Sequence, residues 1–339
     1  MTTTTALAAT DHRLILTAET ADRARQLIED GTPENTRRAR RGALRYFWSW
    51  AAESLDVTES YPVPADVFVR FITEHLTGLP ADVDAALVAA GVKAKPGPHS
   101  VATVEARVSH LAAAHKALGL DSPTADPRVV ALLTAARKHR GRNGGQTRKA
   151  AAALDTLNAL LSTCGEDLAG IRDRALLLVG FAAGGRRRSE LVGATVEDLT
   201  RTNGDYVLTV RHSKADQEGH GLEVPVAGRA AVALRRWLEA AEITAGRIFR
   251  SISRHGGIGS KLSGRAVALI VKRRAELAGF EAADFAGHSL RAGFITEAAG
   301  RGIPLPEVMA LSGHKTVDVA RRYYRAGAAL HNQAARLAG

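Results

Sequence analysis

The sequence predicts a mainly helical protein with a small antiparallel β-sheet, divided into two domains. Alanine and leucine dominate the composition, aromatic residues make up only 5%, and runs of β-branched residues are few. These residue preferences favour helices over strands. The 339 residues are enough for two domains of ordinary size, and a hydrophobic content of 45% is enough to give each a core.

The N-terminal half is typical of a series of amphipathic helices. Residues 36–54 carry apolar side chains at helical spacing on one face and arginines on the other. Ser100 has the character of an N-cap for a helix that ends near Gly119. The other helices that we expect in this half cover 65–77 and 126–140.

Residues 137–149 mark the boundary between the two domains. This segment holds three glycines, six lysines or arginines and no apolar residue. Such a composition is typical of a linker, and its charge also suits contact with a DNA backbone. We therefore expect a partly disordered or helical N-terminal arm in residues 1–30, a helical domain in 31–140, a basic linker in 141–150 and a second domain in 151–339.

The C-terminal half mixes helices with strands. Helical patterns cover 153–163, 168–183 and, after Ser263 as N-cap, 264–279. Strand-like segments rich in β-branched residues cover 206–211, 221–226 and the shorter 247–251. A turn rich in lysine, aspartate and glycine separates the first two strands, which predicts a hairpin.

The charge balance indicates a polyanionic partner. The formal net charge is +11 and the isoelectric point is about 10.2, a combination typical of proteins that bind nucleic acid. The single cysteine, Cys164, excludes a disulfide framework. We find no signal peptide and no apolar run of about 18 residues, so we expect a cytoplasmic, nucleoid-associated protein with no membrane contact.

Chemically useful side chains concentrate in the C-terminal quarter. His288 and Arg291 lie in GHSLRAG, His314 in SGHKT and Tyr323 in RRYYRAG. A guanidinium clamps phosphate oxygens in a bidentate fork, imidazoles donate to the same oxygens or move a proton, and a placed phenol is a nucleophile. Together these groups suit attack on a phosphodiester.

Two further candidates lie upstream. Arg187 in GGRRRSELVG precedes Glu190 by three positions, so the two side chains can pair on one helical face. Lys214 lies in the hairpin turn, where a flexible ammonium can deliver a proton to a leaving oxygen. Taken singly, Arg187 with Glu190 is better explained as a surface salt bridge, and Lys214 as a solvated turn lysine.

The order and spacing of these residue types resemble the tyrosine site-specific recombinases of the phage integrase family. GGRRRSEL resembles the first-arginine box of that family, HSKADQEG its hairpin lysine, and GHSLRAG its His-x-x-Arg box. The segment SGHKTVDVARRYYR resembles the family's terminal stretch from histidine to tyrosine.

The resemblance implies a role for each residue. The family's nucleophile falls nine positions after the terminal histidine, which selects Tyr323 over Tyr324, and the family's arginine precedes the acidic residue by three, which selects Arg187. Tyr323 would form a 3′-phosphotyrosine, Lys214 would protonate the leaving 5′-oxygen, and the arginines would replace a metal, so no cofactor is expected. The full catalytic set is Arg187, Lys214, His288, Arg291, His314 and Tyr323, with Glu190 in support.

The resemblance also implies an architecture on DNA. The helical domain of residues 31–140 would be a core-binding (SAM-like) domain, and residues 151–339 would be an α/β catalytic domain. The two would close as a C-shaped clamp on double-stranded DNA with paired inverted-repeat half-sites. A C-terminal helix, 327–339, would dock on a neighbouring subunit in a homotetramer. Our candidates for DNA contact are Arg37, Arg38, Arg40, Arg41, Arg45, Arg107, Lys116, Arg142, Arg148, Lys149, Arg265, Lys272 and Arg273.

Two other functions fit the same residues. A type IB topoisomerase shares this set of catalytic residue types but relaxes supercoils as a monomer without paired sites. A non-catalytic DNA-binding protein would also be basic and helical. A metal-dependent nuclease is disfavoured, because its two cations need clustered carboxylates and the gathered charges here are positive.

Overall fold

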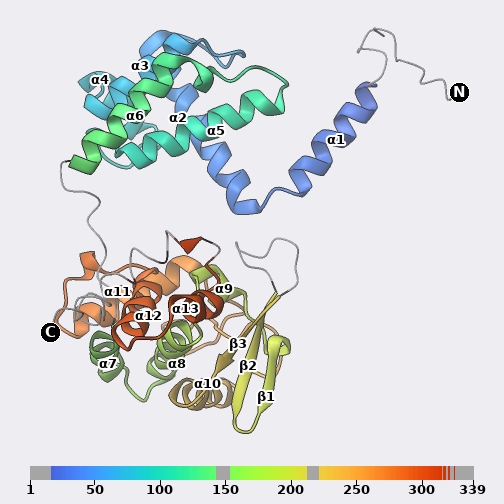
Figure 1. Cartoon of the computed structure of the whole chain (residues 1–339), viewed down its shortest axis with the longest axis vertical. Coiled ribbons are helices and arrows are strands. Elements are labelled where there is room, and N and C mark those ends of the chain that lie inside the picture. The colour runs from blue at the N-terminus through green and yellow to red at the C-terminus, as the bar shows by residue number, and fades with distance from the viewer. Residues whose placement is uncertain are drawn as a thin grey trace, which may run out of the picture. The chain divides into compact units, whose positions relative to one another are not determined.

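The computed structural model describes residues 17–142, 153–211 and 221–314, together with residues 316, 317, 320 and 324. Contacts between residues divide the chain into two units, Met1–Gln146 and Thr147–Gly339. The division falls within 141–150, the segment where the sequence places the linker. Each unit is described by itself (Figure 1).

The N-terminal unit is all-helical within its described part. Helix α2 supplies the centre of the core, where Tyr46, Phe47 and Trp50 are almost fully buried against Phe68 and Phe71 of helix α3. The hydroxyl of Ser100 accepts from the backbone N–H of Thr103, so the predicted N-cap is present. The helices are α1 (Ala18–Asp30), α2 (Glu34–Leu55), α3 (Ala65–Thr77), α4 (Ala81–Ala89), α5 (Val101–Ala117) and α6 (Pro127–Arg142).

Polar side chains join α2, α3 and α5 beneath this core. The Tyr46 hydroxyl lies 2.9 Å from Nε2 of His75 and 3.0 Å from Nε2 of His99. The guanidinium of Arg107 lies 3.3 Å from the centroid of the Tyr46 ring. Burial raises the pKa of Tyr46 to about 12 and lowers the pKa of His75 to about 3. Arg107, a candidate for DNA contact, is thus half-buried and engaged inside its own domain.

The C-terminal unit surrounds one buried helix, α8, which contacts α7, α10 and α12. Its three-stranded antiparallel sheet has the order β1-β2-β3, with Leu208 of β2 opposite Val224 of β3. The elements are α7 (Leu154–Ser162), α8 (Leu168–Ala182), α9 (Arg188–Gly193), β1 (Leu199–Thr202), β2 (Asp205–Val210), β3 (Leu222–Val226), α10 (Arg229–Ala240), α11 (Gly264–Leu277), α12 (Ser289–Gly300) and α13 (Leu305–Ser312). The prediction of a mainly helical protein with a small antiparallel sheet is confirmed.

The predicted third strand at 247–251 is wrong. The third strand is β1, which joins β2 through Asn203 and Gly204, both with positive φ. An Asn-Gly pair suits the tight turn of a two-residue hairpin, because both positions tolerate left-handed backbone. The backbone of residues 247–251 instead forms hydrogen bonds with two separate segments. The Ile248 N–H donates to the Ala194 carbonyl oxygen, and the Phe249 carbonyl oxygen accepts from the Leu262 N–H.

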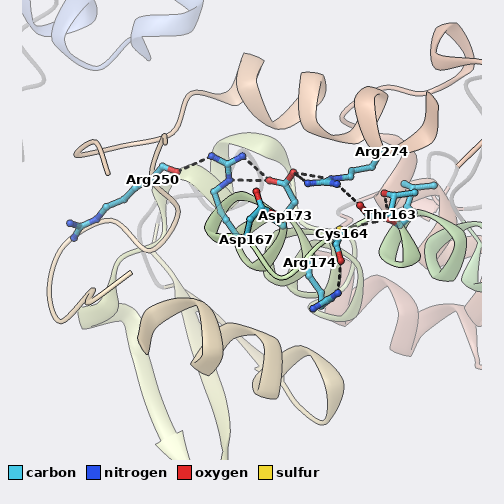
Figure 2. Close-up of polar contacts among 10 residues, drawn as sticks. Thr163, Cys164, Asp167, Asp173, Arg174, Arg250 and Arg274 are labelled. Carbon is cyan, nitrogen blue, oxygen red and sulfur yellow. Dashed lines mark hydrogen bonds and ion pairs between the residues drawn. The ribbon is translucent and has the colours of Figure 1, made fainter. Parts of the chain in front are cut away.

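A buried carboxylate, Asp173 of α8, links four parts of the C-terminal unit (Figure 2). Its Oδ1 accepts from Nε and Nη2 of Arg172, at 3.0 and 2.7 Å, and its Oδ2 accepts from Nε and Nη2 of Arg274 of α11, at 2.9 and 2.8 Å. The two guanidinium groups reach onward to backbone carbonyls, Arg274 to Thr163 after α7 and Arg172 to Arg250. Asp173 therefore holds α8, α11, the segment after α7 and the segment at Arg250 in fixed relative positions.

We predict that Asp173→Asn destabilises the protein by about 3–5 kcal/mol, because it leaves two buried guanidinium groups without a carboxylate. Chemical denaturation followed by circular dichroism measures this change. Glu166→Gln is the control, because the exposed carboxylate of Glu166 also holds two arginines, Arg174 and Arg236. Its loss should have a much smaller effect, and equal effects of the two substitutions would contradict the role of Asp173.

Candidate active site

Two consecutive glycines fold the chain tightly between α8 and α9. Gly184 and Gly185 have φ values of +85° and +69°. A Cβ at Gly184 would lie 2.3 Å from the carbonyl oxygen of Leu311, and one at Gly185 would lie 2.5 Å from Cα of Arg291. Only glycine allows this approach, which brings the arginines after it against α12 and the end of α13.

Arg187 is held at the start of α9 by Glu190. The Glu190 carboxylate accepts from the Arg187 backbone N–H at 3.0 Å and from its Nη1 at 2.7 Å. The Glu190 side chain is 1% exposed and that of Arg187 is 22% exposed. The pair expected from the sequence is therefore present, and it fixes the guanidinium fork while one side of it stays open.

Arg186 is a site residue that the sequence did not reveal. It is 1% exposed, lies 3.6 Å from the Glu190 carboxylate and donates from Nη2 to the carbonyl oxygen of Leu311. Leu311 lies in the last turn of α13, just before His314. Arg186 thus ties the arginine-bearing turn to the segment that carries the second histidine. No sequence signal distinguishes this buried arginine from its neighbours.

Arg291 and His314 are in direct contact. Arg291 of α12 donates from Nη1 to the Gly185 carbonyl oxygen at 3.0 Å, from Nε to Nε2 of His314 at 3.3 Å, and its Nη2 lies 3.0 Å from Nδ1 of His314. The Ser312 hydroxyl lies 2.7 Å from the same Nδ1. Gly313 ends α13 in the left-handed conformation, with φ +67°, which is common for a glycine after the last turn of a helix.

His288 is the N-cap of α12, one helical turn before Arg291. Its side chain is exposed, in contrast to the buried Arg291. Partial desolvation, followed by the charges of Arg188, Arg291 and Arg187, lowers the pKa of His288. A histidine at this edge is neutral at pH 7 and so is able to accept a proton.

The whole cluster is electropositive before any ligand binds. Burial, with the guanidinium groups of Arg291, Arg187 and Arg186, lowers the pKa of His314 to about 4. Protonating this imidazole among three arginines is unfavourable, so the histidine stays neutral at physiological pH. The arrangement stabilises an anion with several oxygens, such as a phosphodiester.

The structure brings together four of the six candidate catalytic residues: Arg187, His288, Arg291 and His314. Lys214 and Tyr323 lie outside the described residues, as does the predicted C-terminal helix, 327–339. Tyr324 is described, and its hydroxyl donates to the carbonyl oxygen of Ile303 at 2.8 Å.

The candidates for DNA contact differ in exposure. Arg38, Arg41, Arg45, Lys116, Arg265 and Arg273 are exposed, whereas Arg37, Arg40 and Lys272 are partly buried. Arg37 and Arg41 form ion pairs with Glu34 at the start of α2. Arg142 ends α6, and Arg148 and Lys149 lie outside the described residues. Their contact with DNA stays a prediction.

Comparison with known proteins settles the family. The phage integrase family matches residues 153–329, more than half of the chain. The chain belongs to the phage integrase family. It is a tyrosine recombinase, an enzyme of DNA strand exchange.

Individual relatives agree with this assignment. An integrase/recombinase xerD homolog of Selenomonas ruminantium is 40% identical over 236 residues, which cover 66% of this chain and 68% of the relative. The tyrosine recombinase XerC of Herpetosiphon aurantiacus is 29% identical over 290 residues, which cover 78% of this chain and 82% of that relative.

Solved structures show that this phage integrase shares its fold with DNA-bound relatives. The Tn1549 transposon integrase in complex with transposon right-end DNA gives a TM-score of 0.59 at 16% identity, covering 93% of this chain and 98% of that one. A lambda integrase dimer bound to a COC′ core site gives a TM-score of 0.53 at 15% identity, covering 90% of this chain and 76% of that one. In the part of the chain that the structure describes, no helix is long and apolar enough to cross a membrane.

We predict that His314 titrates near pH 4 in the DNA-free recombinase and at a higher pH once a phosphate anion lies beside it. Imidazole resonances, assigned by comparison with His314→Gln, report the midpoint in each state. Because an unfolded histidine binds its proton near pH 6.5, this residue also makes folding less stable as pH falls from 6.5 to about 4. A DNA-free midpoint near 6.5 would contradict the proposed surroundings.

Proposed function

We propose that this recombinase cleaves and rejoins DNA through a 3′-phosphotyrosine formed by Tyr323. The observation that carries the proposal is the convergence of Arg187, Arg291 and His314 from three separate segments of the chain. Glu190 fixes the first guanidinium, and the Gly185 carbonyl and His314 fix the second. Two oriented guanidinium groups and a neutral imidazole form a preorganised cradle for a phosphate whose negative charge grows during reaction.

The chemical step is a transesterification. The Tyr323 oxygen forms a bond to phosphorus as the bond from phosphorus to the 5′-oxygen breaks, which leaves the DNA joined through its 3′-phosphate. His288, neutral at pH 7, accepts the phenolic proton or stabilises the phosphate, and Lys214 gives a proton to the departing 5′-oxygen. Attack by that 5′-hydroxyl releases Tyr323 and restores the original strand, whereas attack by a 5′-hydroxyl from a partner strand releases Tyr323 and joins the two strands. The phosphodiester energy is kept, so rejoining needs no nucleotide hydrolysis.

The position of Tyr324 supports Tyr323 as the nucleophile. The Tyr324 hydroxyl is held by the Ile303 carbonyl, and its ring packs on Ile295, Ala298 and Val308. A tyrosine with its hydroxyl engaged in this way anchors the segment to α12 and α13. A hydroxyl engaged with a backbone carbonyl is unsuited to attack a phosphate, so of the two adjacent tyrosines we assign the nucleophile to Tyr323.

We predict that Tyr323→Phe abolishes the covalent protein–DNA adduct and that Tyr324→Phe retains it. The assay uses a duplex selected for binding from a random-sequence pool, and the adduct is resolved by denaturing electrophoresis. Arg187→Gln and Arg291→Gln should each slow adduct formation by roughly 10²–10³, the cost of removing one donor to a developing charge. An adduct lost only with Tyr324→Phe would overturn the assignment of the nucleophile.

We further propose that the enzyme acts as a tetramer on two DNA sites, each with inverted half-sites, at the nucleoid. Four segments of the sequence resemble Cre recombinase: RYFWSWAAE, GLDSPTADP, GHSLRAGFITEAAGRGIPLPEVM and RRYYRAG. This resemblance favours lox-like DNA sites. The curated relatives reported above carry the names XerC and XerD. We therefore propose paired half-sites. Selection of bound duplexes from a random-sequence pool distinguishes a Cre-like from a Xer-like DNA sequence.

We predict that deleting residues 328–339 prevents assembly of two DNA sites into one complex while binding to a single site is retained. In the sequence, Leu330, Ala334 and Leu337 recur at helical spacing, a pattern suited to a helix that docks on a neighbouring subunit. Native electrophoresis with one and two labelled duplexes separates the two states. Unchanged synapsis would contradict docking in trans.

The topoisomerase alternative has its own test. A type IB topoisomerase relaxes a supercoiled plasmid that lacks any selected site, whereas a site-specific recombinase needs its site. Relaxation at equal rates with and without the site would favour the topoisomerase.

A further inference from the structure

Arg188 is the third of three consecutive arginines. Its neighbours Arg186 and Arg187 share the carboxylate of Glu190, whereas Arg188 has no carboxylate partner within the described residues 153–211 and 221–314. Its side chain is half-buried, and its one polar contact there is from Nη1 to the carbonyl oxygen of Gly264, at 3.3 Å. A backbone carbonyl leaves most of the five guanidinium donors unused. A partly desolvated cation without a counter-charge suits an anionic ligand.

The path of this side chain is built by two glycines. Gly264 is the first residue of α11, and Gly287 directly precedes His288. A Cβ on Gly287 would lie 2.0 Å from Cδ and 2.4 Å from Nε of Arg188. Gly287 does not adopt a left-handed φ, so its backbone alone does not require glycine. Glycine is needed at position 287 because the Arg188 side chain occupies the space that a Cβ would fill.

Arg188 lies at the edge of the cluster that His288 occupies. Its charge is the first among the arginines that depress the pKa of His288, ahead of Arg291 and Arg187. Arg186, by contrast, is fully buried and tied to Leu311, and it serves the position of α13. The three consecutive arginines thus have three different surroundings, and only Arg188 combines partial exposure with the absence of a described carboxylate.

We propose that Arg188 binds a backbone phosphate of the DNA strand beside His288, in addition to the phosphate held by Arg187 and Arg291. This inference rests on the proposed cleavage of DNA at this site. The planar guanidinium gives parallel donors to two phosphate oxygens, which a lysine at the same place does not. A second phosphate anchor next to the reacting one fixes the strand on both sides of His288.

The first experiment compares Arg188→Gln with Arg301→Gln. Glutamine keeps a donor for the Gly264 carbonyl and removes the charge. Arg301 is the matched control, because it lies in the same unit and is exposed, and its guanidinium is already paired with Glu297 at 2.8 Å. Binding to the selected duplex is measured by fluorescence anisotropy from 50 to 300 mM salt, with thermal unfolding to confirm that each variant folds.

We expect Arg188→Gln to weaken DNA binding roughly tenfold or more, as loss of a hydrogen-bonded charge pair does. The slope of log affinity against log salt should become shallower by about 0.9, the value for one phosphate contact. The His288 resonance should titrate at a higher pH, and Arg188→Lys should restore the salt slope but only part of the affinity. Arg301→Gln should leave all three readouts unchanged.

The second experiment uses Gly287→Ala, which displaces the Arg188 side chain without changing any charge. We expect this variant to reproduce the loss of affinity and the shallower salt slope, and the double variant to be no weaker than either single one. Additive losses would show that Gly287 and Arg188 act separately and would overturn the proposed path.

The outcomes separate this inference from the proposed function. If Arg188→Gln matches Arg301→Gln in affinity, salt slope and His288 titration, Arg188 binds no phosphate, whatever the catalytic activity. If the wild-type protein forms no covalent adduct, the proposed function fails, and the salt slopes still report whether Arg188 contacts DNA.

Discussion

The interaction on which the site depends is the buried carboxylate of Glu190 beneath two arginines. It orients Arg187 through both the backbone and the side chain, and it lies 3.6 Å from the guanidinium of Arg186. Arg186 in turn holds the end of α13, which places His314 against Arg291. A single acidic residue therefore positions charge on both sides of the phosphate cradle, although it has no direct role in the chemistry we propose.

The same cluster carries more positive charge than its carboxylate balances. Arg186 and Arg187 share one carboxylate, that of Glu190. Their charges and that of Arg291, together with burial, keep His314 neutral. Such an arrangement is costly without a ligand and becomes favourable when a phosphate enters, because the anion then supplies the missing charge. We therefore expect phosphate binding and the protonation state of His314 to be linked.

Sequence patterns predicted the parts of the protein that depend on local chemistry. The caps at Ser100 and Ser263, the spacing of Arg187 and Glu190, and the strands at 206–211 and 221–226 follow from neighbouring residues, and the structure has them. The burial of Arg186 and the contact of Arg291 with His314 were not predictable, because they join segments more than twenty positions apart. The strand β1 and the helix α10 were missed. The Asn-Gly turn after β1 is a local signal that identifies the hairpin.

The central claim is that one phenol, Tyr323, becomes joined to DNA within this arginine and histidine cluster. Mass spectrometry of nuclease-treated adduct, after proteolysis, identifies the modified residue and the polarity of the link. We expect a nucleotide attached through its 3′-phosphate to the peptide containing Tyr323. A nucleotide on another residue, or one attached through its 5′-phosphate, would contradict the account.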